Sequence, residues 1–218
     1  MADILDVISS RKSIRRYTTD PIPQDMILRI LEAGRWAPTG ENYQPWKLLV
    51  VKNPETRAAI ARLAKIGTGS RGTAEYSMNL LQRFDGMRPE EKERALKFYA
   101  TGEVSEFPSK APAVIVAIGD LTVDSPDVPY DVCAMMENMI LEAHSLGLGA
   151  CWIHGPAANI RHAIELKKLL KIPAGMGQYK VLAVMSVGWP IEQRRHSRPK
   201  KPLEDIVYWE EFGRKEPG

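Results

Sequence analysis

Two apolar runs constrain the fold of this 218-residue chain more than any other feature. They cover Ala111–Gly119 and Val181–Gly188. Each has the length of a strand, and an unbroken run without polar alternation is typical of a strand buried on both faces. Neither run is long enough to cross a bilayer as a helix. We therefore expect a sheet that is covered by helices.

The strongest helical pattern is at Val128–Leu148. Its apolar residues, with methionines at 135, 136 and 139, recur at helical spacing, and the pattern ends at Gly147 and Gly149. A methionine stripe of this kind is typical of core filling. Further helices are expected after Asp3, after Pro23 until about Gly34, and at about 54–65 and 156–170, and further strands at 46–51 and 150–153. Helices outnumber strands, which favours the α+β class.

No repeat or low-complexity linker divides the chain, so residues 1–218 are expected to form a single domain. The pattern weakens at 67–110, where a glycine-rich loop at 67–72 and short charged helices near 76–83 and 89–99 predict an inserted, mobile segment. The proline-rich basic tail 189–218 is too long for a simple loop. We expect it to extend toward a neighbouring molecule.

The composition excludes several classes of protein. A charge of +3, from 30 basic and 27 acidic residues, is too small to require a nucleic-acid or membrane partner. Cys133 and Cys151 form no CxxC pair, which predicts two reduced thiols rather than a disulfide framework. The first residues, with Asp3 and Asp6, do not resemble a secretory signal. A cytoplasmic protein is expected.

Several catalytic motifs are missing from the sequence. It has no GxSxG elbow and no HExxH, and its four histidines lack metal-ligand spacing. Gly147-x-Gly149 and Gly175-x-Gly177 lack the third glycine of a dinucleotide fingerprint, and 67–72 lacks the ending of a P-loop. We therefore expect neither a metal site nor a catalytic nucleophile.

A basic stretch near the N-terminus carries the first positive signal. It reads Arg11-Lys12-Ser13-Ile14-Arg15. If the stretch is extended, residues 11, 13 and 15 share one face and present two guanidiniums and a hydroxyl. Such a set suits a phosphate and an electron-rich ring edge, because guanidinium donates bidentate hydrogen bonds. A solvated basic strand or a nucleic-acid-binding arm remains the alternative.

Two later segments are rich in hydrogen-bonding groups. The loop Pro38–Pro45 combines donors and acceptors with a closely approachable backbone. Gly149–Pro156 runs from a strand into the start of a helix, where unsatisfied backbone N–H groups point outward toward an acceptor. Taken alone, each is also compatible with an ordinary connection.

Taken in order, the three segments resemble the nitroreductase family. The family pattern is Arg-x-Ser-x-Arg/Lys, then Ala-Pro-Ser-x-x-Asn-x-Gln-Pro-Trp, then Gly-x-Gly-x-x-Trp/Pro-Ile-x-Gly. Here it is matched by Arg11–Arg15, by Ala37–Trp46 with Thr39 in place of the usual serine, and by Gly147–Gly155. The family's closing Gly-x-Pro and basic tail also appear, at 188–190 and 198–203. Residues 67–110 match nothing, and this is where family members choose their substrates.

The resemblance implies an α+β sandwich, with a central mixed sheet flanked by helices and a C-terminal tail that extends to the partner subunit. It implies an obligate homodimer that holds two FMN molecules in the subunit interface. The implied FMN-binding residues fall into four groups. In the first group, Arg11 and Ser13 bind the phosphate with Arg198 and Lys200, and Lys12 lies in the same stretch; in the second, Arg15 lies by N1 and O2 of the ring. The third group reaches the partner's FMN and consists of Pro38, Thr39, Gly40 and Asn42. In the fourth, backbone groups of Trp152, Ile153, His154 and Gly155 line the ring, with the N–H groups of His154 and Gly155 near N5 and O4.

The implied reaction is a ping-pong transfer of hydride from NADH or NADPH through the flavin to a nitroaromatic, quinone or similar acceptor. Flavin supplies the chemistry, and the protein supplies position and electrostatics. The same scaffold supports reductive dehalogenation, flavin cleavage and oxidase reactions, which stay open. A basic nucleic-acid-binding module is the alternative from another class, although the low charge and the lack of interleaved aromatics count against it.

Overall fold

The computed structural model describes residues 3–74, 86–123, 125–157, 160–173, 177–191 and 200–215. Four strands form one sheet: β1 (Trp46–Val51), β2 (Ala113–Asp120), β3 (Gly149–Ile153) and β4 (Tyr179–Gly188). Their spatial order is β1-β2-β4-β3, and every neighbouring pair is antiparallel. Parallel pairing, which the expected mixed sheet requires, is confined among the described residues to one bridge, between Ser13 and Ala150.

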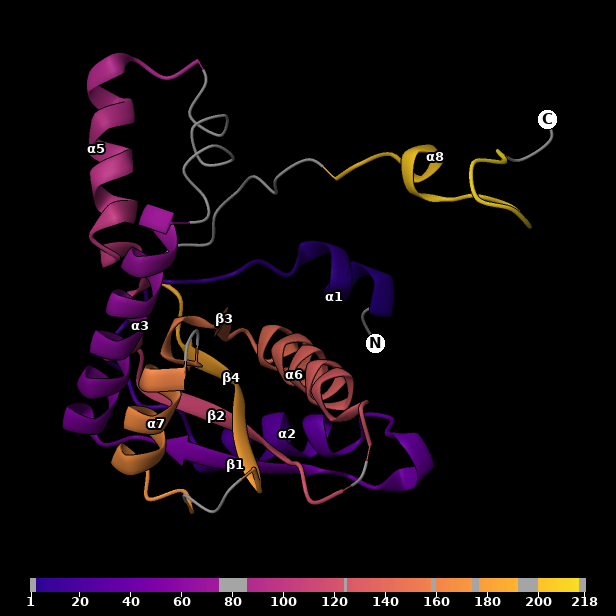
Figure 1. Cartoon of the computed structure of the whole chain (residues 1–218), viewed down its shortest axis with the longest axis horizontal. Helices are drawn as coiled ribbons and strands as arrows, with labels where there is room; N and C mark the ends of the chain where they lie inside the picture. Colours follow the sequence, from indigo (N-terminus) through magenta and orange to yellow (C-terminus); the bar gives the residue numbers. More distant parts are fainter. Residues whose placement is uncertain are drawn as a thin grey trace.

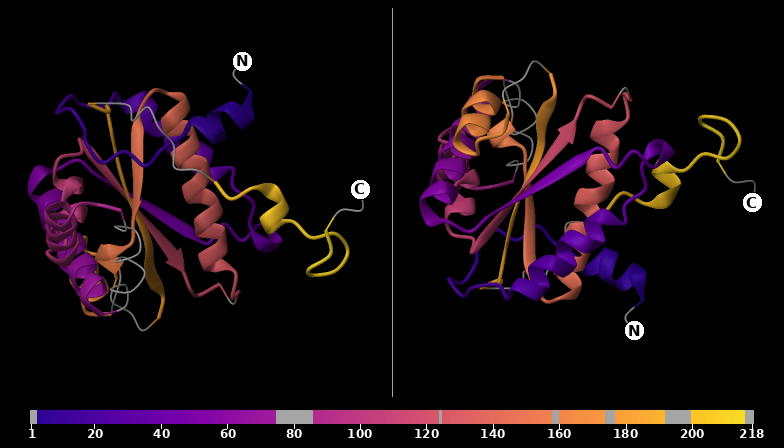
Figure 2. Two further views of the ribbon diagram at one scale, coloured as in Figure 1. Left: turned by 90° about the horizontal axis from the view of Figure 1, so that it is seen from above. Right: turned by 90° about the horizontal axis from the view of Figure 1, so that it is seen from below.

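Helices cover both faces of the sheet, as Figures 1 and 2 show. On one face lie α2 (Gln24–Arg35) and α6 (Val128–Ser145), and on the other lie α3 (Pro54–Ala74) and α7 (Ile160–Leu169). The remaining helices are α1 (Ile4–Ser10), α5 (Pro89–Ala100) and α8 (Leu203–Ile206), with 3-10 turns η1 (Gly40–Asn42), η2 (Glu103–Ser105), η3 (Phe107–Ser109) and η4 (Gly155–Ala157). The α+β class is confirmed.

The two-sided burial of the sheet follows from alternation along its strands. In β2, Ile115 faces the α2–α6 layer while Val114 and Val116 face the α3–α7 layer. The first layer is filled by the methionine stripe of α6, and Met135, Met136 and Met139 are all fully buried. The stripe is therefore core filling, as its spacing predicts. Gly34 lets α2 approach this stripe, because a Cβ there would lie 2.7 Å from Met139 Cγ.

The prediction of a flexible loop at Gly67–Gly72 was wrong. The helix that begins at Pro54 continues through this segment to Ala74, instead of ending near Lys65. Gly67 is needed for packing rather than for a turn, because a Cβ there would lie 2.1 Å from the carbonyl oxygen of Gly155. This close contact offsets the cost of about 1 kcal/mol for glycine inside a helix. The predicted helix at 76–83 lies outside the described residues, and the one at 89–99 is confirmed as α5.

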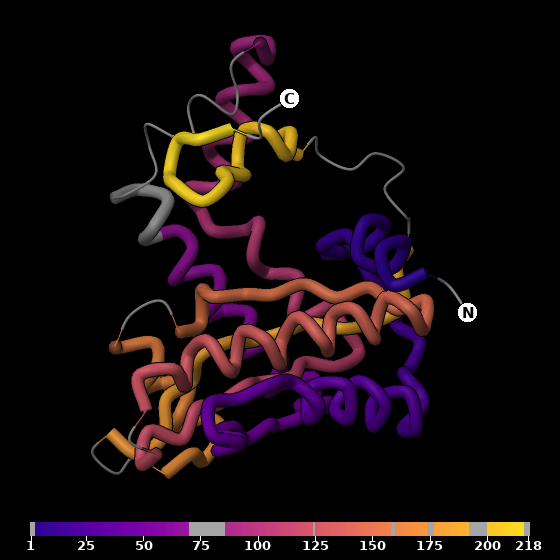
Figure 3. Tube along the Cα trace, turned by 90° about the vertical axis from the view of Figure 1, so that its right-hand side faces the viewer, coloured from indigo at the N-terminus to yellow at the C-terminus, as the bar shows by residue number. Residues whose placement is uncertain are grey.

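The two ends of the chain extend from the helix–sheet body. Helix α1, capped by Asp3 as predicted, lies next to the end of α6, and residues 200–215 stand away from the sheet (Figures 1 and 3). All of residues 200–215 are exposed. The predicted helix at 156–170 begins instead as the η4 turn, with α7 following at Ile160. Within the described ranges, no helix combines the length and apolarity that crossing a membrane requires.

Candidate functional site

The basic stretch at residues 11–17 runs along the outer edge of β3. Ser13 forms a parallel bridge with Ala150, and the Ile14 N–H donates to the Ala150 carbonyl oxygen at 3.0 Å. Ile14 packs so closely over Gly149 that a Cβ on that glycine would lie 2.6 Å from it. The stretch is therefore extended, as the alternation argument requires, and Ile14 faces the sheet.

Arg11, Ser13 and Arg15 share one face, where they surround Cys151 of β3. Burial raises the pKa of the Cys151 thiol, while Arg15, a hydrogen bond with Ser13 and Arg11 act in the opposite direction. The structure thus brings together the two guanidiniums and the hydroxyl that the sequence placed on one face. The thiol beneath them is buried and protonated, which suits a packing residue.

The next residue, Lys12, lies on the other face. With Ser10, Ile14 and His144 it lines a cavity of about 60 Å³ at the end of α6. Ser10 Oγ and His144 Nε2 are 2.8 Å apart. Burial lowers the pKa of His144, and the nearby charges of Arg11 and Lys12 lower it further. Lys12 therefore lies apart from the face formed by Arg11, Ser13 and Arg15, as its alternate position in the extended stretch predicts.

A buried phenol fixes the far end of the stretch. The Tyr17 hydroxyl donates to the Ile14 carbonyl oxygen and lies 2.7 Å from Ser186 Oγ on β4. Burial raises the pKa of Tyr17, so the phenol stays protonated and can donate. This tyrosine, which the sequence analysis did not single out, ties the backbone between Ser13 and Arg15 to the centre of the sheet.

The loop at residues 38–45 has an unusual backbone. Glu41, Asn42 and Gln44 have positive φ values of 49°, 60° and 48°. Non-glycine residues in this region are strained, and surrounding contacts must hold them there. One contact is local, from the Gln44 N–H to Thr39 Oγ1 at 3.2 Å.

One contact from this loop to another element is made by Asp131 of α6, a residue only 8% exposed, whose carboxyl accepts a hydrogen bond from the Gly40 N–H. Burial raises the pKa of Asp131, and the bond from Gly40 acts in the opposite direction. The strained loop is thereby fastened to the N-terminal end of α6. The sequence analysis did not find Asp131, because it belongs to a helix whose pattern indicated only core packing.

The two polar segments of one chain contact α6 at different points along its length. Asp131 fastens the loop at one end, and His144 contacts Ser10 at the other. His144 comes thirteen positions after Asp131 in α6, which corresponds to about 20 Å along the helix. Between the ends, Glu137 Oε1 lies 3.5 Å from Arg11 Nε. Arg11 therefore contacts α6 six residues, or about 9 Å of helix, after the residue that fastens the loop.

The turn that follows β3 is packed tightly against α3. Ile153 and Gly155 are buried, Trp152 is half-buried, and His154 is exposed. A Cβ on Gly155 would lie 2.7 Å from the Ala64 carbonyl oxygen. Because Ser13 is in parallel register with Ala150, Arg15 lies level with Trp152 on the same edge. The structure thus brings Arg11, Ser13 and Arg15 to the start of the predicted ring-lining turn.

The tail and a wide cavity lie elsewhere. Lys200 is exposed, and Arg198 lies outside the described residues. A cavity of about 810 Å³ opens between α3, α5 and the residues before β2, where Lys65 pairs with Glu106 at 3.4 Å. Its α3 residues, such as Arg62 and Lys65, are on the helix face opposite Ala64 and Gly67, which contact Gly155. This cavity is not the space over the β3 edge.

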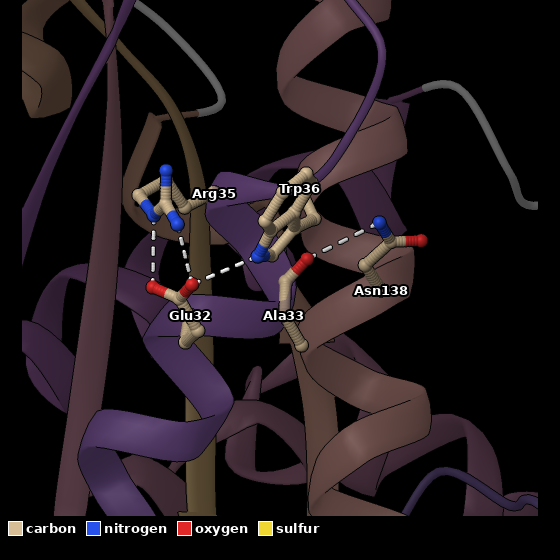
Figure 4. A network of polar contacts seen from close by, with 5 residues as sticks. All are labelled: Glu32, Ala33, Arg35, Trp36 and Asn138. Atoms are coloured by element: carbon tan, nitrogen blue, oxygen red, sulfur yellow. Dashed lines mark hydrogen bonds and ion pairs between the residues drawn. The ribbon is translucent and has the colours of Figure 1, made fainter.

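A further polar cluster joins α2 to α6 (Figure 4). Glu32 accepts two hydrogen bonds from Arg35, at 2.8 and 2.5 Å, and one from Trp36 Nε1 at 2.8 Å. These bonds, those from Arg35 first, lower the pKa of Glu32 to about 2. Asn138 of α6 donates to the Ala33 carbonyl oxygen at 3.2 Å. The cluster holds Trp36 on the surface, with 73% of the residue exposed.

Large apolar side chains are exposed on α1 and on the tail as well. Ile4 and Leu5 are 72% and 64% exposed, and Phe212 is 93% exposed. Where exposed apolar side chains form contiguous patches, they often mark interaction sites.

Known proteins resemble this chain along most of its length. A profile of the Nitroreductase family matches residues 8–189. The NADH dehydrogenase of Thermus thermophilus is 28% identical, covering 91% of this chain and 92% of its own. The iodotyrosine deiodinase of Thermotoga neapolitana is 21% identical, covering 95% and 97%. An FMN-dependent nitroreductase from Clostridium difficile has a similar structure, with a TM-score of 0.70, 20% identity and coverage of 95% and 99%. The chain belongs to the nitroreductase family.

Proposed function

We propose that this protein is an FMN-dependent oxidoreductase that transfers a hydride from NADH or NADPH to a small acceptor such as a nitroaromatic or a quinone. The observation that supports it most is the placement of Arg11, Ser13 and Arg15 on one face at the edge of β3. When bound, FMN would accept the hydride and pass it on, in two separate half-reactions. The residues of the chain would bind and orient it.

The donor set fits the phosphate of FMN. Arg11 Nε is buried, and no hydrogen-bond acceptor serves it in the described part of the chain; Glu137 is at 3.5 Å. A phosphate oxygen is the acceptor that such a guanidinium matches best. Arg11 and Ser13 would therefore hold the phosphate, with Arg198 and Lys200 from the tail and Lys12 at the margin.

Arg15 is proposed to lie at the N1–O2 edge of the flavin ring. Its guanidinium would stabilise the negative charge that two-electron reduction places there. Backbone groups of Trp152, Ile153, His154 and Gly155 would line the ring, with the N–H groups of His154 and Gly155 near N5 and O4. The rigid packing of this turn against α3 supports a precise position for those groups.

A homodimer with FMN at the subunit interface is part of the proposal. Pro38, Thr39, Gly40 and Asn42 would reach the FMN of the partner, as the resemblance to the nitroreductase family implies. The exposed apolar residues of α1 and of the tail offer surface for such an interface. Light scattering should give a dimer, and a monomer that still holds FMN tightly would contradict this.

The variable segment at 67–110 is proposed to choose the acceptor, within one domain that spans the whole chain. A cytoplasmic location is also proposed, on the support of the two free cysteines. The protein should purify yellow, with about one FMN per chain. A colourless protein that does not bind added FMN would refute the assignment.

Redox titration of arginine variants tests the placement of the flavin. A charge-assisted hydrogen bond contributes about 1.5–3 kcal/mol, so Arg15→Ala should lower the midpoint potential by roughly 30–60 mV. Arg11→Ala should mainly weaken FMN binding, because a phosphate contact is remote from the ring. Arg16→Ala, the neighbour on the alternate face, is the matched control and should leave the potential unchanged. An unshifted potential in Arg15→Ala with FMN bound would show that this residue is misplaced.

Reductive dehalogenation is the second candidate, since the Thermotoga iodotyrosine deiodinase matches nearly the whole chain. The two reactions are separated by mixing reduced, FMN-loaded protein without oxygen with either an iodinated phenol or a nitroaromatic. Release of iodide at a rate that exceeds nitro reduction would favour the second candidate.

A further inference from the structure

Arg15 lies over an aromatic ring that comes from the variable segment. Its guanidinium carbon is 5.7 Å from the centroid of the Phe107 ring, within the distance of about 6 Å at which a cation is attracted to a π face. Phe107 belongs to η3, at the C-terminal end of the 67–110 segment. The residue proposed to touch the flavin edge is thus in contact with the segment proposed to choose the acceptor.

The ring is a fixed platform. Pro108, the next residue, is buried, and Phe107 itself packs against the core layer between the sheet and α3. Arg57 of α3 donates hydrogen bonds to the carbonyl oxygens of Ser109, at 3.3 Å, and Ala111. These contacts hold the backbone on the C-terminal side of the ring.

The guanidinium, by contrast, has few other contacts. Arg15 is exposed, and among the described residues no carboxylate forms an ion pair with it. Its backbone is held by the Ile14–Ala150 hydrogen bond. A long side chain of this kind loses rotamer entropy when it is ordered, so a contact is needed to hold it in one orientation. The face of the Phe107 ring is placed to select one orientation.

Both ends of the variable segment meet beside this platform. Thr68 of α3 donates a hydrogen bond to Ser105 Oγ at 2.7 Å, two residues before Phe107. Thr68 Oγ1 would also lie 3.1 Å from a Cβ on Gly155, in the proposed ring-lining turn. The base of the segment therefore rests directly on two elements of the proposed flavin site.

We propose that Phe107 is a positioning residue, which holds the Arg15 guanidinium where it acts on the flavin, so that the segment that chooses the acceptor also sets the flavin potential. The inference rests on the proposed function, and in particular on Arg15 lying at the N1–O2 edge. Phe107 acts through Arg15 and not on the reacting atoms. The negative face of the ring attracts the guanidinium, and an aliphatic side chain of similar size would not.

Redox titration of the FMN-loaded protein tests the inference. Phe107→Leu keeps an apolar side chain and removes the π face, and it should weaken the preference for reduced over oxidised flavin about two- to fivefold, which corresponds to about 10–20 mV for a two-electron couple. Phe107→Tyr keeps the π face and should retain the wild-type potential. Phe98→Leu, on α5, is the matched control and should cause no shift. If Phe107→Leu does not retain FMN, Phe107→Met takes its place.

The decisive comparison uses the Arg15→Ala background. There, Phe107→Leu should produce no additional shift, because the residue through which it acts is gone. A shift of equal size with and without Arg15, or no shift in either apolar variant, would overturn the inference. If Arg15→Ala itself leaves the potential unchanged with FMN bound, the placement of Arg15 fails first, and the inference fails with it.

A measurement without flavin provides an independent check. In the apoprotein, a double-mutant cycle between Arg15→Ala and Phe107→Leu should show a coupling of about two- to fivefold in the unfolding equilibrium constant. Absence of coupling in the apoprotein would show that the ring does not attract the guanidinium, which contradicts the inference.

Discussion

Tyr17→Phe should destabilise the protein and loosen the proposed phosphate-binding stretch. The substitution removes one oxygen atom and keeps the ring that packs in the core. That oxygen donates to the Ile14 carbonyl and lies 2.7 Å from Ser186 Oγ. Ser186 is fully buried, so water cannot replace the lost partner without rearrangement.

The size of the effect follows from the two groups that lose their hydrogen-bond partner, the Ile14 carbonyl and the Ser186 hydroxyl. A buried polar group without its partner costs about 1–3 kcal/mol. In a protein of 150–250 residues, 1 kcal/mol corresponds to a change of about 2–4 °C in Tm, so the variant should unfold about 2–12 °C lower. FMN affinity should also fall, because the Ile14 carbonyl lies between Ser13 and Arg15 and is no longer tied to β4.

Denaturant unfolding of wild type and variant measures the change in the free energy of unfolding, and FMN titration measures the change in affinity. Tyr130→Phe is the matched control: it makes the same chemical change at a residue that is 73% exposed, and its effect should stay within about 0.5 kcal/mol. Ser186→Ala in the Tyr17→Phe background should cost little more, since both partners are then gone. Unchanged stability in Tyr17→Phe would refute the reasoning.

The same phenol gives a prediction about alkaline pH. Burial raises the folded-state pKa of Tyr17 above its ordinary value, so the folded protein holds this proton more tightly than the unfolded chain does. The corresponding stability is fully present below the unfolded pKa of about 10 and is lost as the pH rises above it. Wild type should therefore lose stability in this range more steeply than Tyr17→Phe, and parallel curves would contradict the assignment.

Three further perturbations test other contacts. The pKa of Glu32 is lowered to about 2, so its contribution to stability is complete above about pH 4.3 and is lost as the pH falls below that value. Glu32→Gln should therefore reduce the fall of the unfolding midpoint with decreasing pH below about pH 4.3. An unaltered pH dependence in this range would exclude this role. Asp131→Ala removes the acceptor of the Gly40 N–H and should weaken FMN binding about ten- to a hundredfold in a fluorescence titration; unchanged affinity would mean that the loop needs no anchor. Gly67→Ala forces a Cβ against the Gly155 carbonyl oxygen and should cost about 1–3 kcal/mol in denaturant unfolding, whereas wild-type stability would show that α3 can move away.

The elements of the fold were predictable where the sequence has a strong period. The buried runs became β2 and β4, and the methionine stripe became α6, because burial on two faces or on one helical face leaves a regular pattern. The end of α3 was not predictable in the same way. Glycines at 67, 69 and 72 indicate a loop by propensity, but Gly67 is there for its contact with Gly155, which is distant in the sequence.

In the candidate site, too, residues placed by a local pattern were predictable and residues placed by distant contacts were not. Extended geometry alone places Arg11, Ser13 and Arg15 on one face, and the structure brings them together around Cys151. Asp131 and Phe107 could not be found from local patterns, because each acquires its role from a partner far away in the chain. Lys12 is adjacent to Arg11 and Ser13 in the sequence, but its side chain has the alternate orientation in the extended stretch. It lines the cavity beside His144 instead of the face around Cys151.

Helix α6 gives the buried core a part in the proposed site. One end of the helix fastens the strained loop through Asp131, its middle pairs Glu137 with Arg11, and its far end contacts Ser10 through His144. In the proposed dimer, the loop and the basic stretch of one chain would bind two different FMN molecules. The spacing between the two sites therefore depends on the position of α6. The fully buried methionine stripe, which packs against the sheet and is closely approached by Gly34, fixes the position of this helix. Packing in that layer therefore determines where the loop fastened by Asp131 and the stretch beside Glu137 and His144 lie relative to each other.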